Sequence, residues 1–158
     1  MVDHILEFRL CLPRSRVEVF PFFAAPENLV TVTPRWLHLS VLAAPVELEA
    51  GAVIDCQIRW FGVRFRWRSL IREYDPPYRF VDVQLRGPYA RWEHRHLFLD
   101  ADGGTWVEDR VTYRLPLGPV GQWAHALLVR RQLEAIFAYR RMRLLERFGG
   151  SGSSGGVE

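Results

Sequence analysis

Hydrophobic and polar residues alternate with a period of two from Trp36 onward. The segments 37–41, 54–60 and 65–71 all follow this rule, which is typical of strands with one buried and one solvent-facing side. Turn residues interrupt the pattern at Phe61-Gly62, Asp75-Pro76-Pro77, Gly87-Pro88 and Asp102-Gly103-Gly104. Strands joined by such short turns pair as antiparallel neighbours. The pattern therefore predicts a meander of about six strands.

The segment before the meander predicts one more strand and two short helices. Residues 4–12 alternate and are rich in Ile, Leu and Phe, as in a strand. Ser15-Arg16-Val17-Glu18 has the spacing of a capping box, and Pro21 requires the helix that it opens to be short or kinked. Pro26 suits the first position of a second helix, over 26–30, and Thr33-Pro34 ends the pair.

The C-terminal part predicts a long helix from Gly118-Pro119 to about Phe148. About 30 residues would measure ~45 Å, against ~33 Å for a strand of ten residues. We therefore expect the helix to cross the sheet diagonally. The fold class is α+β: a curved antiparallel sheet of about seven strands wrapped around this helix, with two short helices after strand 1. We expect one domain over 1–148 and a flexible Gly/Ser tail over 149–158.

Charged residues interrupt the apolar arc of the long helix. Arg130, Glu134 and Arg141 fall within it, and Arg130 and Glu134 are spaced to pair along the helix. Such an arc suits a helix that faces an incompletely filled space. The alternative is that the charges reach solvent from the helix edge. The apolar members of the arc are Trp123, Leu127, Phe137, Leu144, Leu145 and Phe148.

Composition narrows the function classes. The 158 residues are 49% hydrophobic and 13% aromatic, with six Trp, and the net charge is +3. The Arg residues are spread along the chain, so we expect no nucleic-acid partner. Cys11 and Cys56 are too few for a disulfide framework, which favours a reducing cytoplasm. There is no signal-peptide pattern and no apolar window long enough to span a membrane, and we expect a cytoplasmic monomer or homodimer.

The element order and several local motifs resemble the START-like, or SRPBCC, ligand-binding superfamily over residues 1–148. Pro26-Glu27-Asn28-Leu29 with Thr33-Pro34 and Trp36 resembles its helical lid. Residues 80–84, Gly87-Pro88-Tyr89 and the Trp92–Phe98 segment resemble one uncharacterised bacterial branch. The resemblance implies a helix-grip fold with a cavity for a hydrophobic small molecule. It does not determine chemistry, because the superfamily includes polyketide cyclase/dehydrase-like proteins, coenzyme Q-binding proteins, hydrolases and hormone receptors.

The stretch from Arg91 to Phe98 carries the candidate chemistry. Alternation places Trp92, His94, His96 and Phe98 on one face, and Asp82, Gln84 and Asp109 on neighbouring strands would converge with them if these are inner faces. A buried His beside a carboxylate has a tunable pKa and can act as general acid or base. His94, His96 and Asp109 are therefore the candidate catalytic residues. The competing interpretation is a hydrogen-bonded network that rigidifies the sheet.

We predict neither a metal site nor a cofactor. Two His at i and i+2 with a nearby Asp would supply three ligands, but no helical His/Glu pair or Cys cluster accompanies them. The Arg64/Arg66/Arg68 stripe is interpreted as a solvated strand face, and the alternative is peripheral docking to an anionic membrane or a protein.

Three functional hypotheses follow. The first is binding of a lipid, isoprenoid, quinone or polyketide-like molecule between sheet and helix. The second is a cyclase or dehydratase in which His94 moves a proton and Asp109 orients it. The third is a scaffold whose cavity is filled by the Trp side chains. The candidate ligand-binding residues are Trp60, Phe65, Trp67, Gln84, Trp92, Phe98, Tyr113, Trp123, Leu127, Arg130, Glu134 and Phe137.

Overall fold

The computed structural model describes residues 2–60, 62–116, 118, 120, 123 and 128–149. The predicted Gly/Ser tail beyond Gly149, the candidate Leu127 and most of the predicted helix before residue 128 lie outside the described residues. The domain boundary at 148 therefore stays a prediction.

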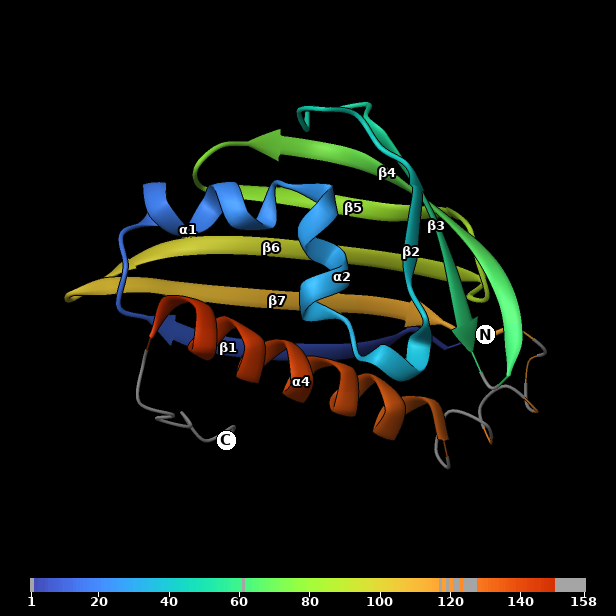
Figure 1. The fold of residues 1–158 in the computed structure, drawn as a ribbon. Coiled ribbons are helices and arrows are strands. Elements are labelled where there is room, and N and C mark those ends of the chain that lie inside the picture. Colours follow the sequence, from blue (N-terminus) through green and yellow to red (C-terminus); the bar gives the residue numbers. More distant parts are fainter. Residues whose placement is uncertain are drawn as a thin grey trace.

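An antiparallel sheet of seven strands forms the body of the molecule (Figure 1). Its spatial order is β1-β7-β6-β5-β4-β3-β2, so the predicted meander runs in chain order and β1 pairs with its last strand. This confirms the predicted fold class. The strands are β1 His4–Leu12, β2 Ser40–Ala43, β3 Val53–Trp60, β4 Val63–Asp75, β5 Arg79–Arg86, β6 Arg91–Ala101 and β7 Gly104–Arg114.

Short helical elements follow β1, as predicted. They are α1 Arg16–Phe23, the 3₁₀ turn η1 Pro26–Asn28, α2 Leu29–Val32 and the 3₁₀ turn η2 Arg35–Leu37. At the start of α1 the Glu18 carboxylate accepts the Ser15 backbone N–H at 3.0 Å, the contact expected of a capping box. Pro21 lies inside α1, which has only eight residues.

The strand predicted from Trp36 begins later than expected. Residues 35–37 form the turn η2 after Pro34, His38 adopts the left-handed conformation with φ 45°, and β2 starts at Ser40. The backbone hydrogen bonds from Leu37 to Pro34 and from His38 to Arg35 close this turn. Leu37 in the turn and Leu39 just after it both line the interior. Their spacing of two residues therefore resembles the alternation of a strand.

Helix α4, Arg130–Phe148, packs on the same side of the sheet as α1 and α2 (Figure 1). Its 19 residues measure about 28 Å, so the described helix is not longer than the strands beneath it. Its buried residues are Leu133, Phe137 and Leu144. The buried face is therefore rotated about the helix axis relative to the predicted arc. Arg130 and Glu134, which lie within that arc, are exposed and pair with each other at 2.9 Å.

Two apolar clusters hold the helices against the sheet at its opposite ends. At one end Phe20 of α1 meets Phe98 edge-to-face at 5.0 Å between ring centroids, and Leu144 packs in the same cluster. At the other end the Phe137 ring stacks on Phe8 of β1 at 4.1 Å, and Leu133 lies close by. The space between these clusters becomes the interior of the site.

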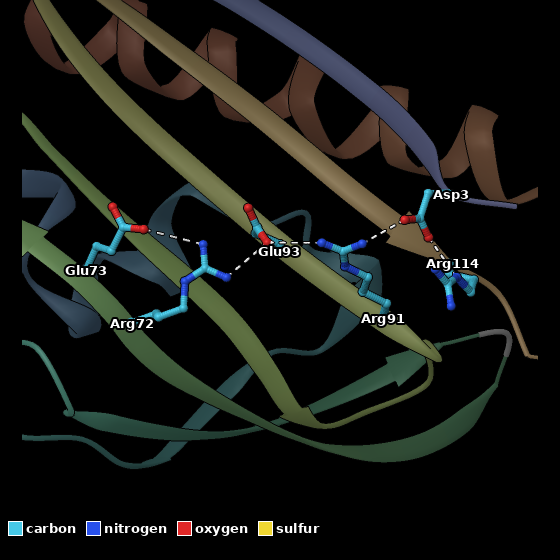
Figure 2. A network of polar contacts seen from close by, with 6 residues as sticks. All are labelled: Asp3, Arg72, Glu73, Arg91, Glu93 and Arg114. Carbon is cyan, nitrogen blue, oxygen red and sulfur yellow. Dashed lines mark hydrogen bonds and ion pairs between the residues drawn. The ribbon is translucent and has the colours of Figure 1, made fainter.

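The outer face of the sheet carries a chain of ion pairs (Figure 2). Glu93 of β6 is its centre, because it accepts Arg72 at 3.1 Å and Arg91 at 3.4 Å. The face predicted to meet solvent therefore also ties β4, β6, β7 and the residue before β1 together. The chain comprises Glu73, Arg72, Glu93, Arg91, Asp3 and Arg114.

Leu144→Ala tests the docking of α4. Leu144 is 2% exposed, so we expect a loss of about 2–5 kcal/mol in the free energy of unfolding, measured by urea denaturation. Met142→Ala, on the same helix at 47% exposure, is the matched control and should change stability by about 0.5 kcal/mol or less. Equal losses in both variants would contradict the packing described.

Candidate functional site

A cavity of about 210 Å³ lies between the concave face of the sheet, the short helices and α4. Apolar side chains of β3 and β4, including Ile58, Trp67 and Ile71, form one wall. Leu29 of α2 and Phe137 of α4 close it from the helical side. The Trp60 indole N–H donates to the Gln132 side-chain oxygen, so β3 and α4 are also joined by a hydrogen bond. The cavity is therefore lined by both layers of the fold and is partly open to solvent.

Polar side chains from three adjacent strands meet at one side of this cavity. Strand pairing sets Asp82 of β5 opposite His94 of β6, and His96 opposite Asp109 of β7. Because alternate residues of a strand point to the same face, all four side chains lie on the concave side. His94, His96 and Asp109 are buried, and the Asp82 side chain is 18% exposed. The structure thus brings together the candidate catalytic residues and Asp82.

The two carboxylates lie on opposite sides of the His pair. Asp109 Oδ1 is 2.9 Å from His94 Nε2 and 2.8 Å from His96 Nδ1. Only the first contact has hydrogen-bond geometry, and His96 Nδ1 has no other partner among the described residues. Asp82 Oδ2 is 3.3 Å from His96 Nε2 and 3.8 Å from His94 Nδ1. Each imidazole therefore has one nitrogen toward each carboxylate.

Arg140 of α4 completes the cluster from the helical side. Its guanidinium lies 4.0 Å from Asp109 Oδ1 and over the Phe23 ring, with 5.1 Å from Cζ to the centroid. Its Nε is buried without a hydrogen-bond partner among the described residues. Arg140 also lines the cavity, so it can donate to a polar atom bound there.

Burial and neighbouring charges shift the pKa values of this cluster in different directions. Burial lowers the pKa of His94, and His96 lowers it further against the opposing effect of Asp109. Burial also acts to lower the pKa of His96, but Asp109 and Asp82 outweigh it and raise the pKa above its ordinary value. For Asp109, burial opposes ionisation, yet Arg140 and the two His hold its pKa well below the usual range. The surroundings of Asp109 therefore favour its ionised form.

The predicted ligand-binding residues divide into two groups. Those that line the cavity are Trp60, Trp67, Trp92 and Phe137, together with His94 and His96. The remaining described candidates lie outside the lining of this cavity, and they are Phe65, Gln84, Phe98, Tyr113, Trp123, Arg130 and Glu134.

Each residue outside the lining has another place in the fold. Phe98 and Tyr113 are completely buried in the two apolar clusters. The Gln84 amide donates to the Tyr89 carbonyl at 2.8 Å and so fixes the turn after β5. Phe65 packs edge-to-face on Trp60. Trp123 is 73% exposed.

Most residues that line the cavity were not among the predicted site residues, and Arg140, Leu29 and Cys56 are three of them. Arg140 lies three positions after Phe137 and so shares its helix face, a spacing that would have identified it. Leu29 enters from α2, and Cys56 borders the cavity from β3. Burial raises the pKa of the Cys56 thiol to about 11.

Solved structures share this fold, whereas no family model and no curated protein matches the chain. Protein CV1439 from Chromobacterium violaceum is 12% identical, with a TM-score of 0.72, over 93% of this chain and 98% of that one. Ara h 8.0201 is 15% identical, with a TM-score of 0.60, over 92% and 99%. A nucleoside-diphosphate sugar epimerase from Corynebacterium glutamicum is 26% identical, with a TM-score of 0.67, over 89% of this chain but 28% of its own.

These matches cover about nine-tenths of the chain, and they confirm the START-like resemblance at the level of the fold. The chain has the helix-grip fold, in which a curved antiparallel sheet holds a C-terminal helix across its concave face. Within the described residues, no helix is long and apolar enough to cross a membrane.

Asp109→Asn and Asp82→Asn should differ in their cost to the fold. Asp109 is buried between both His and Arg140, so removing its charge leaves Arg140 uncompensated and should cost about 3 kcal/mol or more. Asp82 faces the cavity and its replacement should cost less than half as much. Urea denaturation at neutral pH measures both, and equal costs would contradict the distinction between the two carboxylates.

Proposed function

We propose that this protein binds a hydrophobic small molecule, of the lipid, isoprenoid, quinone or polyketide-like class, in the cavity between the sheet and α4. The observation that carries the proposal is a partly enclosed cavity with a mostly apolar wall, in which the charged side chains and the His pair gather at one side. Ligand sites in proteins have this composition, in which a few polar groups orient a molecule held mainly by apolar contact.

The size of the cavity favours a ligand over a filled scaffold. Its volume of about 210 Å³ is many times the ~15 Å³ that one water needs by the same kind of measure. Trp60, Trp67 and Trp92 stand at its wall without closing it. Burial of about 200 Å² of apolar ligand surface there would contribute roughly 5 kcal/mol before the costs of association.

A cyclase or dehydratase is the second candidate, and one observation favours it. His94 borders the cavity and its Nε2 is held by the buried Asp109 at 2.9 Å, as expected of an oriented imidazole beside a bound substrate. Turnover of a polyketide-like substrate by the wild type, lost in His94→Ala, would support this activity. Turnover unchanged in that variant would remove His94 from the mechanism.

Filling the cavity should abolish ligand binding. Ile136 of α4 lines the cavity and is half-buried, so Ile136→Trp would place an indole in the space that the ligand needs. We expect the wild type, purified without detergent, to retain or take up a molecule from a panel of fatty acids and quinones, as seen by native mass spectrometry. Binding to Ile136→Trp should fall at least tenfold.

Met142→Trp is the matched control, because it adds the same side chain on the exposed face of α4. It should bind as the wild type does. A clean apo mass, no uptake across the panel and no difference between the two variants would overturn the proposal.

Cys56 offers an internal reporter of the same cavity. With Cys11→Ser as background, only this buried thiol reacts, and a pKa of about 11 should make alkylation at pH 8 about 100-fold slower than in the unfolded chain. A quinone or fatty acid bound against Cys56 should slow the reaction further. An alkylation rate that no bound molecule changes would show that the molecule occupies another place.

A further inference from the structure

Hydrogen bonds account for only two of the four contacts between the imidazoles and the carboxylates, His94 Nε2 with Asp109 and His96 Nε2 with Asp82. Asp109 contacts one nitrogen of each imidazole, His94 Nε2 and His96 Nδ1. The other two nitrogens turn to the opposite side, where Asp82 Oδ2 lies 3.3 Å from His96 Nε2 and 3.8 Å from His94 Nδ1. The longer of these two contacts is beyond hydrogen-bond distance.

We propose that Asp82, His94 and His96 bind one divalent first-row transition-metal ion of the zinc class. Among the described residues, one donor atom from each of these three side chains lies within 4.8 Å of the others. Donors of a tetrahedral zinc ion with bonds of about 2.0–2.1 Å are roughly 3.3 Å apart. Side-chain shifts of about an ångström therefore bring all three donors to bonding distance. This inference goes beyond the binding of an apolar ligand and does not depend on it.

Asp109 has the position of a supporting group behind the two imidazoles. A metal-binding His ordinarily donates its second ring N–H to a carboxylate, which fixes the tautomer and leaves the other nitrogen for the ion. Asp109 Oδ1 forms this hydrogen bond with His94 Nε2 at 2.9 Å, and it lies 2.8 Å from His96 Nδ1, where a small rotation of the ring would be needed for a second hydrogen bond. The metal would then bind His94 through Nδ1 and His96 through Nε2.

The charges around the cluster fit a divalent ion. Arg140 lies 4.0 Å from Asp109 and offsets the charge of that carboxylate. Asp82 has no Arg or Lys contact among the described ion pairs and supplies the negative charge on the metal side. Two neutral imidazoles and one carboxylate are a donor set that suits zinc or iron(II).

One side of the proposed metal remains open to the cavity. All three ligands border the cavity, whereas Asp109, behind them, does not. Three protein ligands with a free position distinguish sites that accept an exogenous ligand from closed structural sites, which use four. An oxygen atom of a molecule in the cavity can take that position, and the unpartnered Nε of Arg140 borders the same space.

The test is metal titration of the full chain after treatment with a chelator. We expect one Zn²⁺ per chain by calorimetry, and Co²⁺ should give the visible absorption of a four- or five-coordinate ion. Binding should be lost in His94→Ala and in His96→Ala and weakened at least tenfold in Asp82→Asn. Asp109→Asn should weaken it by 10- to 100-fold through the orientation of the imidazoles.

His38→Asn is the matched control, because His38 is exposed, has a left-handed backbone that Asn tolerates, and lies outside the cluster. It should bind Zn²⁺ as the wild type does. Circular dichroism identifies variants that fail to fold. Asp82→Asn is expected to disturb the fold least, because Asp82 faces the cavity, so this variant keeps the test decisive if another variant unfolds.

Two outcomes would overturn the proposal. The first is no stoichiometric binding and no rise in the melting temperature of the wild type with Zn²⁺ or Co²⁺. The second is binding that is equal in the wild type and in Asp82→Asn, His94→Ala and His96→Ala, which would place the ion elsewhere. Either result leaves the binding of an apolar molecule, measured with the Ile136→Trp variant, to be judged separately.

Discussion

The register of β6 is the constraint on which the rest of the structure depends. Its alternate residues must place His94 and His96 inside and Arg91 and Glu93 outside, and a slip by one residue would exchange the two sets. The outer ion pairs make such a slip costly, because Glu93 pairs with Arg72 of β4 and Arg91 pairs with Asp3 before β1 (Figure 2). The same pairing positions the inner cluster against Asp82 and Asp109.

A cluster of buried charges needs compensation on every side. Two carboxylates, two imidazoles and one guanidinium meet here, and isolated charges of this kind would be expensive to remove from water. Arg140 can compensate Asp109 only because α4 is docked by Leu133, Phe137 and Leu144 on the same face. The apolar clusters at the two ends of the sheet therefore fix the electrostatics of the cavity between them as well as the fold.

Period-two alternation and turn residues predicted β1, the meander and the meeting of His94, His96 and Asp109, because strand geometry maps spacing directly onto faces. The helix was harder. Because Trp123 and Leu145 were assigned to the core, Arg130 and Glu134 fell in the middle of the predicted apolar arc. In the structure the helix instead packs through the neighbouring face, which carries Leu133, Phe137 and Arg140. No local feature of the sequence distinguishes an Arg that pairs with a buried carboxylate from an Arg that faces solvent. The difference depends on partner residues from strands that are distant in the sequence.

The cavity is chemically divided, and the division follows from the order of strands in the sheet. β3 and β4 contribute Ile58, Trp67 and Ile71, whereas the charged residues come from β5, β6 and α4. A molecule that is apolar along most of its length and carries oxygen at one end would match both walls best in one orientation, because reversal would place its oxygen against a wall with few polar groups, among them the Ser69 hydroxyl. The sheet topology would thus select the direction in which such a molecule enters, before any single contact distinguishes one ligand from another.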